Sequence, residues 1–287
     1  MKLGYYPGCS LHSTAAEYNM ATEAVFDALD LELAELPEWN CCGATAGHST
    51  DRFLSLALPL RNLVIAEVEQ QKELVLPCAA CYNLVKAADH YVREGTPEAK
   101  DANEELKSIM GASYSGNVHV THPLEVIMRK EILSRVGGEV KRPLKGLKLA
   151  PYYGCLLTRP TYVAFDDVEQ PQAMDKLMNM VGADVRKWSY KTDCCGGSLT
   201  VPRTDVVYEI TRNLVTAAQR AGADAIVTAC PLCQMTLETR QKEIQKPIPI
   251  FFFTELLGIS FGHPEAKKWM KKHIIDPVPL LTSLQLL

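Results

Sequence analysis

The sequence predicts an α/β fold built from two similar halves, each with a mostly parallel sheet. Short apolar runs alternate with longer stretches of helical periodicity along all 287 residues, and the cysteine pattern of the first half recurs in the second. Strands that alternate with helices need crossover connections, and these make neighbouring strands parallel. We expect the halves, residues 1–145 and 146–287, to be related by a pseudo-two-fold axis.

The first half reads as four strands, each followed by a helix. The strands are short apolar runs, and the helices carry apolar residues at the spacing of one helix face, as Ala15, Tyr18 and Val25 do. In order, the predicted elements are a strand over 2–6, a helix over 14–29, a strand over 33–39, a helix over 52–71, a strand over 74–76, a helix over 79–92, a strand over 118–121 and a helix over 123–134.

The second half repeats this order. Its predicted elements are a strand over 147–153, a helix over 172–181, a strand over 184–188, a helix over 205–221, a strand over 225–228, a helix over 232–244, a strand over 249–252 and a short helix after it. Glycine and basic residues are concentrated in 137–148, so we place the join between the halves there.

Ten cysteines are the unusual feature of a composition that is otherwise ordinary, with 47% hydrophobic residues, 22% charged residues and a net charge of −4. The first residues contain no apolar run that would direct export, so we expect a cytoplasmic protein with reduced thiols. Its longest apolar stretch, residues 248–261, is too short to span a bilayer. No basic patch suggests nucleic acid as a partner. The cysteines therefore indicate metal binding or redox chemistry.

The cysteines form two sets of five, with none left over. The first set is Cys9, Cys41, Cys42, Cys78 and Cys81, and the second set is Cys155, Cys194, Cys195, Cys230 and Cys233. Their flanks agree: residues 5–9 match 152–155 if the proline is missing from the second copy, 40–44 match 193–197, and 76–81 match 228–233. Residues 118–124 also correspond loosely to 248–256. This agreement indicates a tandem duplication.

Every cysteine group follows the end of a predicted strand. The loops at the carboxyl ends of parallel strands converge on one crevice, which is where open parallel sheets bind ligands. Three loops that are distant in the sequence would therefore bring five thiols to one place. The same arrangement in both halves predicts two metal sites that face each other.

Three interpretations compete for such a site. Structural disulfides fit poorly, because adjacent cysteines such as Cys41 and Cys42 bridge each other only with strain. A zinc ion suits the Cys-x-x-Cys spacings, but it takes four thiolates and each set holds five. An iron–sulfur cluster contains several metal ions, so neighbouring thiolates can bind different irons. We favour the cluster, although the usual ferredoxin run of cysteines is absent from the sequence.

These motifs carry a family resemblance. A cysteine, a Cys-Cys-Gly motif and a Cys-x-x-Cys motif follow one another twice, which is typical of the CCG domain. Over residues 1–260 the chain resembles the B subunit of heterodisulfide reductase, beginning with Tyr5-Tyr6-Pro7-Gly8-Cys9. In that family each half binds a non-cubane [4Fe-4S] cluster made of fused [3Fe-4S] and [2Fe-2S] parts. The resemblance therefore implies two such clusters, held by the two sets of cysteines.

The same resemblance implies a function. The family reduces the mixed disulfide of coenzyme M and coenzyme B in methanogenesis, and this substrate binds between the clusters. The C subunit of the family's complex, with ordinary [4Fe-4S] clusters, supplies electrons, and the flavin-containing A subunit lies upstream. We expect the catalytic subunit of a cytoplasmic complex of this type, acting on that disulfide or a related one. Two equivalent clusters would match the two sulfur atoms of the substrate.

Residues other than cysteine are needed for protons and for anionic groups of the substrate. His48, six residues after Cys42, is the first candidate proton donor and His12 is the second. A loop histidine near a cluster is, however, more often a hydrogen-bond partner or simply exposed. The candidates for binding substrate anions are Arg52, Arg159, Lys191 and Arg203. The glycines beside the cysteines are predicted to give the backbone room to turn.

Two other functions stay open at this point. CCG domains also occur in subunits that resemble those of glycolate and lactate oxidases and of thiol-driven fumarate reductase, where they relay electrons or reduce a quinone. A zinc-stabilised scaffold is the non-catalytic alternative. No G-x-G-x-x-G motif follows a predicted strand, so NADH cannot serve as donor without a partner. Residues 251–253 or 279–287 are the predicted apolar surface for that partner.

Overall fold

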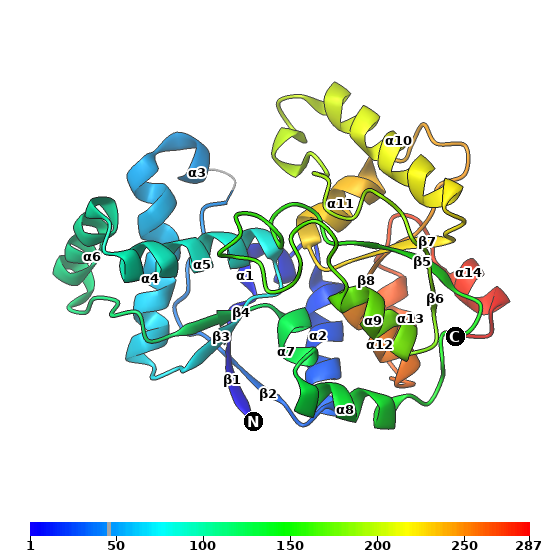
Figure 1. The fold of residues 1–287 in the computed structure, drawn as a ribbon, viewed down its shortest axis with the longest axis horizontal. Helices are drawn as coiled ribbons and strands as arrows, with labels where there is room; N and C mark the ends of the chain where they lie inside the picture. Colours follow the sequence, from blue (N-terminus) through cyan, green and yellow to red (C-terminus); the bar gives the residue numbers. More distant parts are fainter. Residues whose placement is uncertain (45–46) are drawn as a thin grey trace.

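Two four-stranded parallel sheets lie side by side in the computed structural model, which describes residues 1–44 and 47–287 (Figure 1). The first sheet has the strand order β2-β1-β3-β4 and the second has the matching order β6-β5-β7-β8. All six strand pairings are parallel. The strands are β1 (Lys2–Tyr5), β2 (Glu32–Glu35), β3 (Glu73–Val75), β4 (His119–Thr121), β5 (Lys148–Tyr152), β6 (Asp184–Val185), β7 (Ala225–Thr228) and β8 (Ile250–Phe252). The expected α/β fold with two similar halves is confirmed.

Helices cover the sheets and follow the strands in the predicted alternation. Those of the first half are α1 (Gly8–Leu11), α2 (Ala16–Ala28), α3 (Gly47–Thr50), α4 (Arg52–Val68), α5 (Ala79–Glu94), α6 (Pro97–Met110), α7 (Pro123–Ile127) and α8 (Lys130–Glu139). Those of the second half are α9 (Ala173–Met180), α10 (Thr204–Arg220), α11 (Pro231–Thr239), α12 (Phe253–Ser260), α13 (Ala266–Met270) and α14 (Val278–Ser283). Because β7 is covered on both faces, all four of its residues are buried.

Helix α6 was not predicted from the sequence. Its sequence is mostly charged, and its few buried residues are small or isolated, namely Ala99, Ala102 and Leu106. The ends of the helix are nevertheless well marked. The Thr96 side chain caps the N-terminus, and Gly111 takes the left-handed conformation at the C-terminus.

The helix predicted over 123–134 is divided into α7 and α8, so this prediction was wrong in its extent. Arg129 leaves the helical conformation, with φ −62° and ψ 136°, and its guanidinium group pairs with Glu73 at the start of β3. Within the stretch 137–148, where the join between the halves is expected, Gly137 and Gly138 are part of α8, and residues 140–147 connect α8 to β5.

The two halves pack against each other through α2 and α12, which lie together near the centre of Figure 1. The Tyr18 ring of α2 stacks on Phe252, with ring centroids 4.1 Å apart. Phe251, Phe252 and Phe253 are fully buried, so the prediction that they form a partner surface was wrong. In the tail, Leu281 and Leu286 are also buried. No helix among the described residues has the length and apolar character needed to cross a membrane.

Candidate metal centre

The cysteines of the first set lie at the carboxyl edge of the first sheet, as expected. Cys9 lies in α1, directly after β1. Cys41 and Cys42 lie in the loop that follows β2. Cys78 and Cys81 lie at the N-terminus of α5, after β3. Hydrogen bonds to neighbouring thiols, Cys230 for Cys78 and Cys42 for Cys81, raise the pKa of both, and burial adds to this.

The thiols of the first set form a chain of contacts. The Sγ atoms of Cys9 and Cys41 are 3.9 Å apart, and those of Cys42 and Cys81 are 3.1 Å apart. The Cys41 thiol also hydrogen-bonds to Cys42, and the Cys78 thiol to Cys81. The contact order is therefore Cys9, Cys41, Cys42, Cys81 and Cys78.

The second set repeats this order in the other half. Cys155 hydrogen-bonds to Cys194, Cys194 to Cys195, Cys195 to Cys233, and Cys233 to Cys230. As in the first half, the Cys-x-x-Cys pair begins a helix, here α11, with Cys230 as its N-cap. The order of contacts is thus a property of the duplicated unit.

The two sets meet at Cys78 and Cys230. Both thiols are buried, and they hydrogen-bond to each other across the two halves. All ten sulfur atoms therefore form one continuous chain, and the two candidate sites adjoin each other.

Hydrogen bonds between thiols stabilise a thiolate in each set. Hydrogen bonds from Cys41 and Cys81 lower the pKa of Cys42 to about 4. In the second half, hydrogen bonds from Cys155 and Cys195 lower the pKa of Cys194 to about 2. Each set therefore contains at least one thiolate at neutral pH, which is the form of cysteine that binds metal.

A glycine precedes the first cysteine of each set and leaves room for a sulfur atom. Gly8 and Gly154 have positive φ angles of 70° and 67°. A Cβ atom on Gly8 would lie 3.1 Å from the Sγ of Cys81, and one on Gly154 would lie 3.0 Å from the Sγ of Cys233. Both the backbone conformation and the close approach of sulfur therefore require glycine.

The tyrosine two residues before each of these glycines corrects the predicted alignment of the two halves. The rings of Tyr6 and Tyr152 both pass within 4 Å of the glycine Cβ position. Each hydroxyl donates a hydrogen bond to the carbonyl before the Cys-Cys pair, Asn40 in one half and Asp193 in the other. Tyr6 thus corresponds to Tyr152, and no proline is missing, because Tyr153 stands in its place.

The second set lines a cavity of about 290 Å³. All five of its cysteines reach this cavity, which is otherwise lined mainly by apolar side chains. These include Ala79, Ala80, Leu84, Leu156 and Leu232. Within residues 1–44 and 47–287, no group of three or more His, Cys, Asp or Glu side chains has the geometry to hold a single metal ion. The five sulfur donors and the hollow between them fit an iron–sulfur group.

Two side chains that sequence reasoning missed connect the paired Cys-x-x-Cys motifs. His122 Nε2 lies 3.0 Å from the carbonyl oxygen of Pro77 and 3.1 Å from that of Ala229, the residues just before Cys78 and Cys230. The Tyr18 hydroxyl donates to the same two oxygens. Burial lowers the pKa of His122 to about 4, so it is neutral and donates one N–H. The position of His122 directly after the predicted strand over 118–121 was the signal in the sequence that could have identified it.

The predicted proton donors lie in the first half. His12 is half-exposed and lies 3.3 Å from a carboxylate oxygen of Glu35, with its ring edge against Trp39. The side chain of His48 falls outside the described part of the chain. Both remain predictions.

The predicted anion-binding residues are spread over the molecule. Arg159 and Arg203 are exposed and pair with Glu169 and Asp205 respectively. Lys191 is buried, and its ammonium group donates to Asp175 at 2.6 Å and to the Pro171 carbonyl. Arg52 is exposed and pairs with Glu98 at 3.1 Å. None of the four is shown to contact the thiols, and their roles remain predictions.

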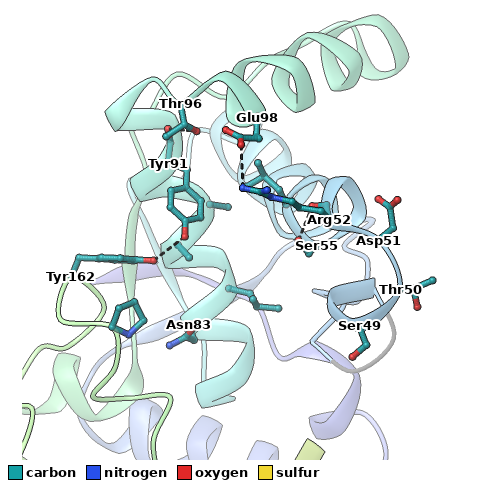
Figure 2. A pocket seen from close by; sticks show the side chains of 15 residues that line it. Ser49, Thr50, Asp51, Arg52, Ser55, Asn83, Tyr91, Thr96, Glu98 and Tyr162 are labelled. Carbon is teal, nitrogen blue, oxygen red and sulfur yellow. Dashed lines mark hydrogen bonds and ion pairs between the residues drawn. The ribbon is translucent and has the colours of Figure 1, made fainter.

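A larger cavity, of about 760 Å³, lies between α4, α5 and α6 (Figure 2). Arg52 and Glu98 form one wall, and the hydroxyl groups of Tyr91 and Tyr162 meet on another at 3.3 Å. Asn83 and Leu84 line both this cavity and the thiol-lined one. The two cavities are therefore neighbours. Asn83 also bridges the halves, because its amide donates to two carbonyls of the second half.

The fold and site define a duplicated α/β protein with one cysteine-lined site per half. Residues 3–86 and 149–238 match the cysteine-rich domain called CCG. The chain therefore belongs to the CCG cysteine-rich domain family.

Relatives of full length support this assignment. The chain is 28% identical to the 8-methylmenaquinol:fumarate reductase membrane anchor subunit of Wolinella succinogenes, covering 97% of this chain and 99% of that protein. It is 25% identical to the B subunit of the ferredoxin:CoB-CoM heterodisulfide reductase of Methanosarcina mazei, covering 99% and 97%. It is 24% identical to lactate utilization protein A of Bacillus thuringiensis, covering 90% and 99%. These relatives indicate a subunit of an oxidoreductase complex, and the family indicates iron–sulfur binding.

One solved structure shares the fold. A hypothetical protein from Helicobacter pylori superimposes on 95% of this chain with a TM-score of 0.73 and 13% identity. This chain spans about half, 51%, of that protein. At this identity the likeness concerns the fold alone.

Proposed function

We propose that the protein is the catalytic subunit of a heterodisulfide reductase-like complex and that it reduces a disulfide to two thiols. One observation carries this proposal: two sets of five thiols, in the same order of contact, meet at Cys78 and Cys230. Such a pair of adjoining sites suits a substrate with two adjoining sulfur atoms. The similarity to the B subunits of the CoB-CoM heterodisulfide reductases supports it.

Two non-cubane [4Fe-4S] clusters are the proposed cofactors, one held by each set of five cysteines. When bound, they would supply electrons and Lewis-acidic iron at the substrate sulfurs. The glycines at positions 8 and 154 leave space beside the thiols, and the tyrosines at positions 6 and 152 fix the loop that bears each Cys-Cys pair.

The proposed reaction consumes two electrons and two protons, breaks one S–S bond and releases two thiols. The substrate is the coenzyme M–coenzyme B heterodisulfide or a related disulfide. Apolar residues of the thiol-lined cavity, such as Leu156 and Leu232, limit the access of water to the reacting sulfurs. His48 and His12 are the proposed proton donors.

The large cavity beside the cysteines is the proposed entry for the substrate. It adjoins the thiol-lined cavity at Asn83 and Leu84, and Arg52 lies on its wall. Of the four predicted anion-binding residues, Arg52 alone lines it, so we assign Arg52 to an anionic group of the substrate. Unlike Arg52, Lys191 is buried and donates to Asp175 and to the Pro171 carbonyl, which favours a structural role for this lysine.

The proposal also covers the role of each half, the location of the complex and its partners. Residues 1–145 and 146–287 each bind one cluster, and the complex is cytoplasmic. Electrons come from partners that resemble the C and A subunits of heterodisulfide reductase, one ferredoxin-like and one containing flavin. The B subunits of heterodisulfide reductases among the relatives support a multi-subunit assembly.

Incubation with thiols during electron paramagnetic resonance tests the proposed function. Protein prepared without oxygen is oxidised and mixed with candidate thiols, including coenzyme M and coenzyme B. We expect a new signal that depends on the thiol and is lost in Cys233→Ala. An iron-loaded protein whose spectrum ignores every thiol and disulfide tested would contradict disulfide chemistry.

A second candidate function is an electron relay in a reductase of the fumarate type. It is favoured by the 28% identity to the Wolinella succinogenes protein, which exceeds the 25% identity to the heterodisulfide reductase relatives. Incubation of the iron-loaded protein with a menaquinol analogue distinguishes the two candidate functions. Reduction of the clusters by the quinol, with no response to thiols, would favour the relay. Zinc in place of iron would favour the scaffold alternative.

A further inference from the structure

A cavity of about 560 Å³ opens on the surface of the second half, between the loop after β6 and helix α10. Two aromatic and two basic side chains dominate its lining: Trp188, Tyr190, Arg212 and Arg220. We call these four residues the α10 surface. Helix α10 stands at one end of the molecule, far from α6 (Figure 1).

The α10 surface is basic. Arg212 and Arg220 are exposed, and within the described residues neither guanidinium group has an ion-pair partner. Lys187 is exposed next to Trp188 in the chain, and no Asp or Glu lines the cavity. In a protein with a net charge of −4, this local positive charge favours an acidic partner. Tryptophan, tyrosine and arginine are also the residues that contribute most at protein interfaces.

A series of rings joins the α10 surface to the second set of cysteines. The ring centroids of Tyr190 and Trp188 are 6.2 Å apart, and those of Trp188 and Tyr152 are 6.1 Å apart. Tyr152 and the Sγ of Cys233 both lie within 4 Å of the same Cβ position at Gly154. Burial raises the pKa of Tyr152, and the nearby cysteines raise it further, Cys233 most of all.

The first half has a comparable tyrosine–tryptophan pair beside its cysteines, but its surroundings differ. Trp39 packs edge-on to Tyr6 with centroids 5.4 Å apart, yet its indole N–H donates to Glu35, and Glu38 is exposed beside it. Arg61 and His12 also contact this segment, so its charges are mixed. Both halves therefore have a tyrosine–tryptophan pair, but the pair in the second half continues to Tyr190 and to two arginines that have no ion-pair partner among the described residues.

We propose that the α10 surface docks a small acidic electron-transfer protein that donates electrons to the cluster held by the second set of cysteines. Each electron leaves the reduced partner, which is oxidised by one electron, and crosses Trp188 and Tyr152. Arg212 and Arg220 pair with acidic groups of the partner, and the rings of Trp188 and Tyr190 form the centre of the contact. This inference rests on the proposed cluster binding.

Binding of an acidic two-cluster ferredoxin to the iron-loaded protein tests the docking. The probe variant carries Arg212→Glu and Arg220→Glu together. We expect Kd to rise by about tenfold or more at low salt, and wild-type binding to weaken as salt is added. The control variant carries Lys100→Glu and Lys107→Glu on α6, which changes the net charge equally at the opposite end of the molecule, and should bind nearly as the wild type does.

Stopped-flow reduction by the same ferredoxin tests the ring series. Trp188→Leu should slow reduction of the iron-loaded protein more than it weakens binding, and Trp39→Leu in the first half is its matched control. Failure of the wild type to bind, or equal loss in the probe and control variants, would overturn the docking proposal. Displacement of the ferredoxin by inorganic phosphate alone would instead assign the surface to a small anion. Self-association of the wild type that is lost in the probe variant would assign it to a second copy of this chain. A protein without iron would instead overturn the proposed function.

Discussion

At the scale of single residues, the site depends on positions where only one residue type fits. Gly8 and Gly154 combine a positive φ with a sulfur atom at the place of a side chain. The repeated glycines could be singled out in the sequence because they precede matching cysteines. Their partners in space could not, since Cys81 and Cys233 are far away in the chain and the close approach arises only in the folded protein.

Gly8→Ala and Gly154→Ala should each lower the iron content of one set of cysteines. The methyl group would lie about 3 Å from a cysteine sulfur, and a Cβ atom at positive φ costs about 1–2 kcal/mol. Gly111→Ala is the control, because Gly111 has a similar φ of 72° and nothing within 4 Å of its Cβ position. We expect iron loss in the first two variants and only mild destabilisation in the third. Equal iron content in all three would contradict this role.

His122→Leu should destabilise the protein by about 1–2 kcal/mol, because the carbonyls of Pro77 and Ala229 keep only the Tyr18 hydroxyl as donor and the Leu124 N–H loses its acceptor. The side chain keeps a similar bulk, so the effect reports the lost hydrogen bonds. Equilibrium unfolding in denaturant measures it. His119→Leu, on the exposed side of β4, should change the free energy of unfolding by less than about 0.5 kcal/mol. Similar values for both variants would show that the shared hydrogen bond is unimportant.

At the scale of elements, the sequence predicted the strands best. Most strands are short apolar runs, but β2 and β6 are partly exposed and contain acidic residues, and they end earlier than the predicted strands 33–39 and 184–188. Helix α6 was missed because its buried residues form no continuous apolar stripe. The break between α7 and α8 was also missed, because the partner of Arg129 is Glu73, which lies in another element.

The C-terminal segment is held by a buried ionic group that joins three elements. His273, after α13, lies 2.7 Å from a carboxylate oxygen of Glu238 in α11 and 3.0 Å from one of Glu255 in α12. Burial opposes protonation of His273, but Glu255 and Glu238 raise its pKa to about 11. The imidazolium therefore stays charged in the folded protein at neutral pH.

His273→Gln should destabilise the protein by about 3–5 kcal/mol near pH 6, since two buried carboxylates lose their cation. An unfolded histidine releases its proton near pH 6.5, whereas the folded one keeps it up to about pH 11. The stabilisation is thus complete below pH 6.5 and is lost as the pH rises toward 11. Unfolding of the wild type and the variant between pH 6 and 10 should show a shrinking difference. A difference that is constant or grows would contradict this assignment.

At the scale of the whole molecule, duplication gives two sites, and packing of the halves makes them adjoin. Both sets of five cysteines could be predicted from the repeat alone. The contact of Cys78 with Cys230 depends on how the halves are placed, and this is set by contacts between the halves that no sequence pattern shows, such as those of Tyr18, His122 and Asn83. The sequence also could not show that Trp188 lies beside Arg212 and Arg220, whereas Trp39 donates a hydrogen bond to Glu35.

The most direct test of the central claim is the iron and acid-labile sulfide content of protein prepared without oxygen, for the wild type, Cys81→Ala and Cys233→Ala. Two independent four-iron sites predict two clusters in the wild type and loss of about half of the iron in each variant. Wild-type protein with no iron, or with one zinc ion in each half, would contradict the claim.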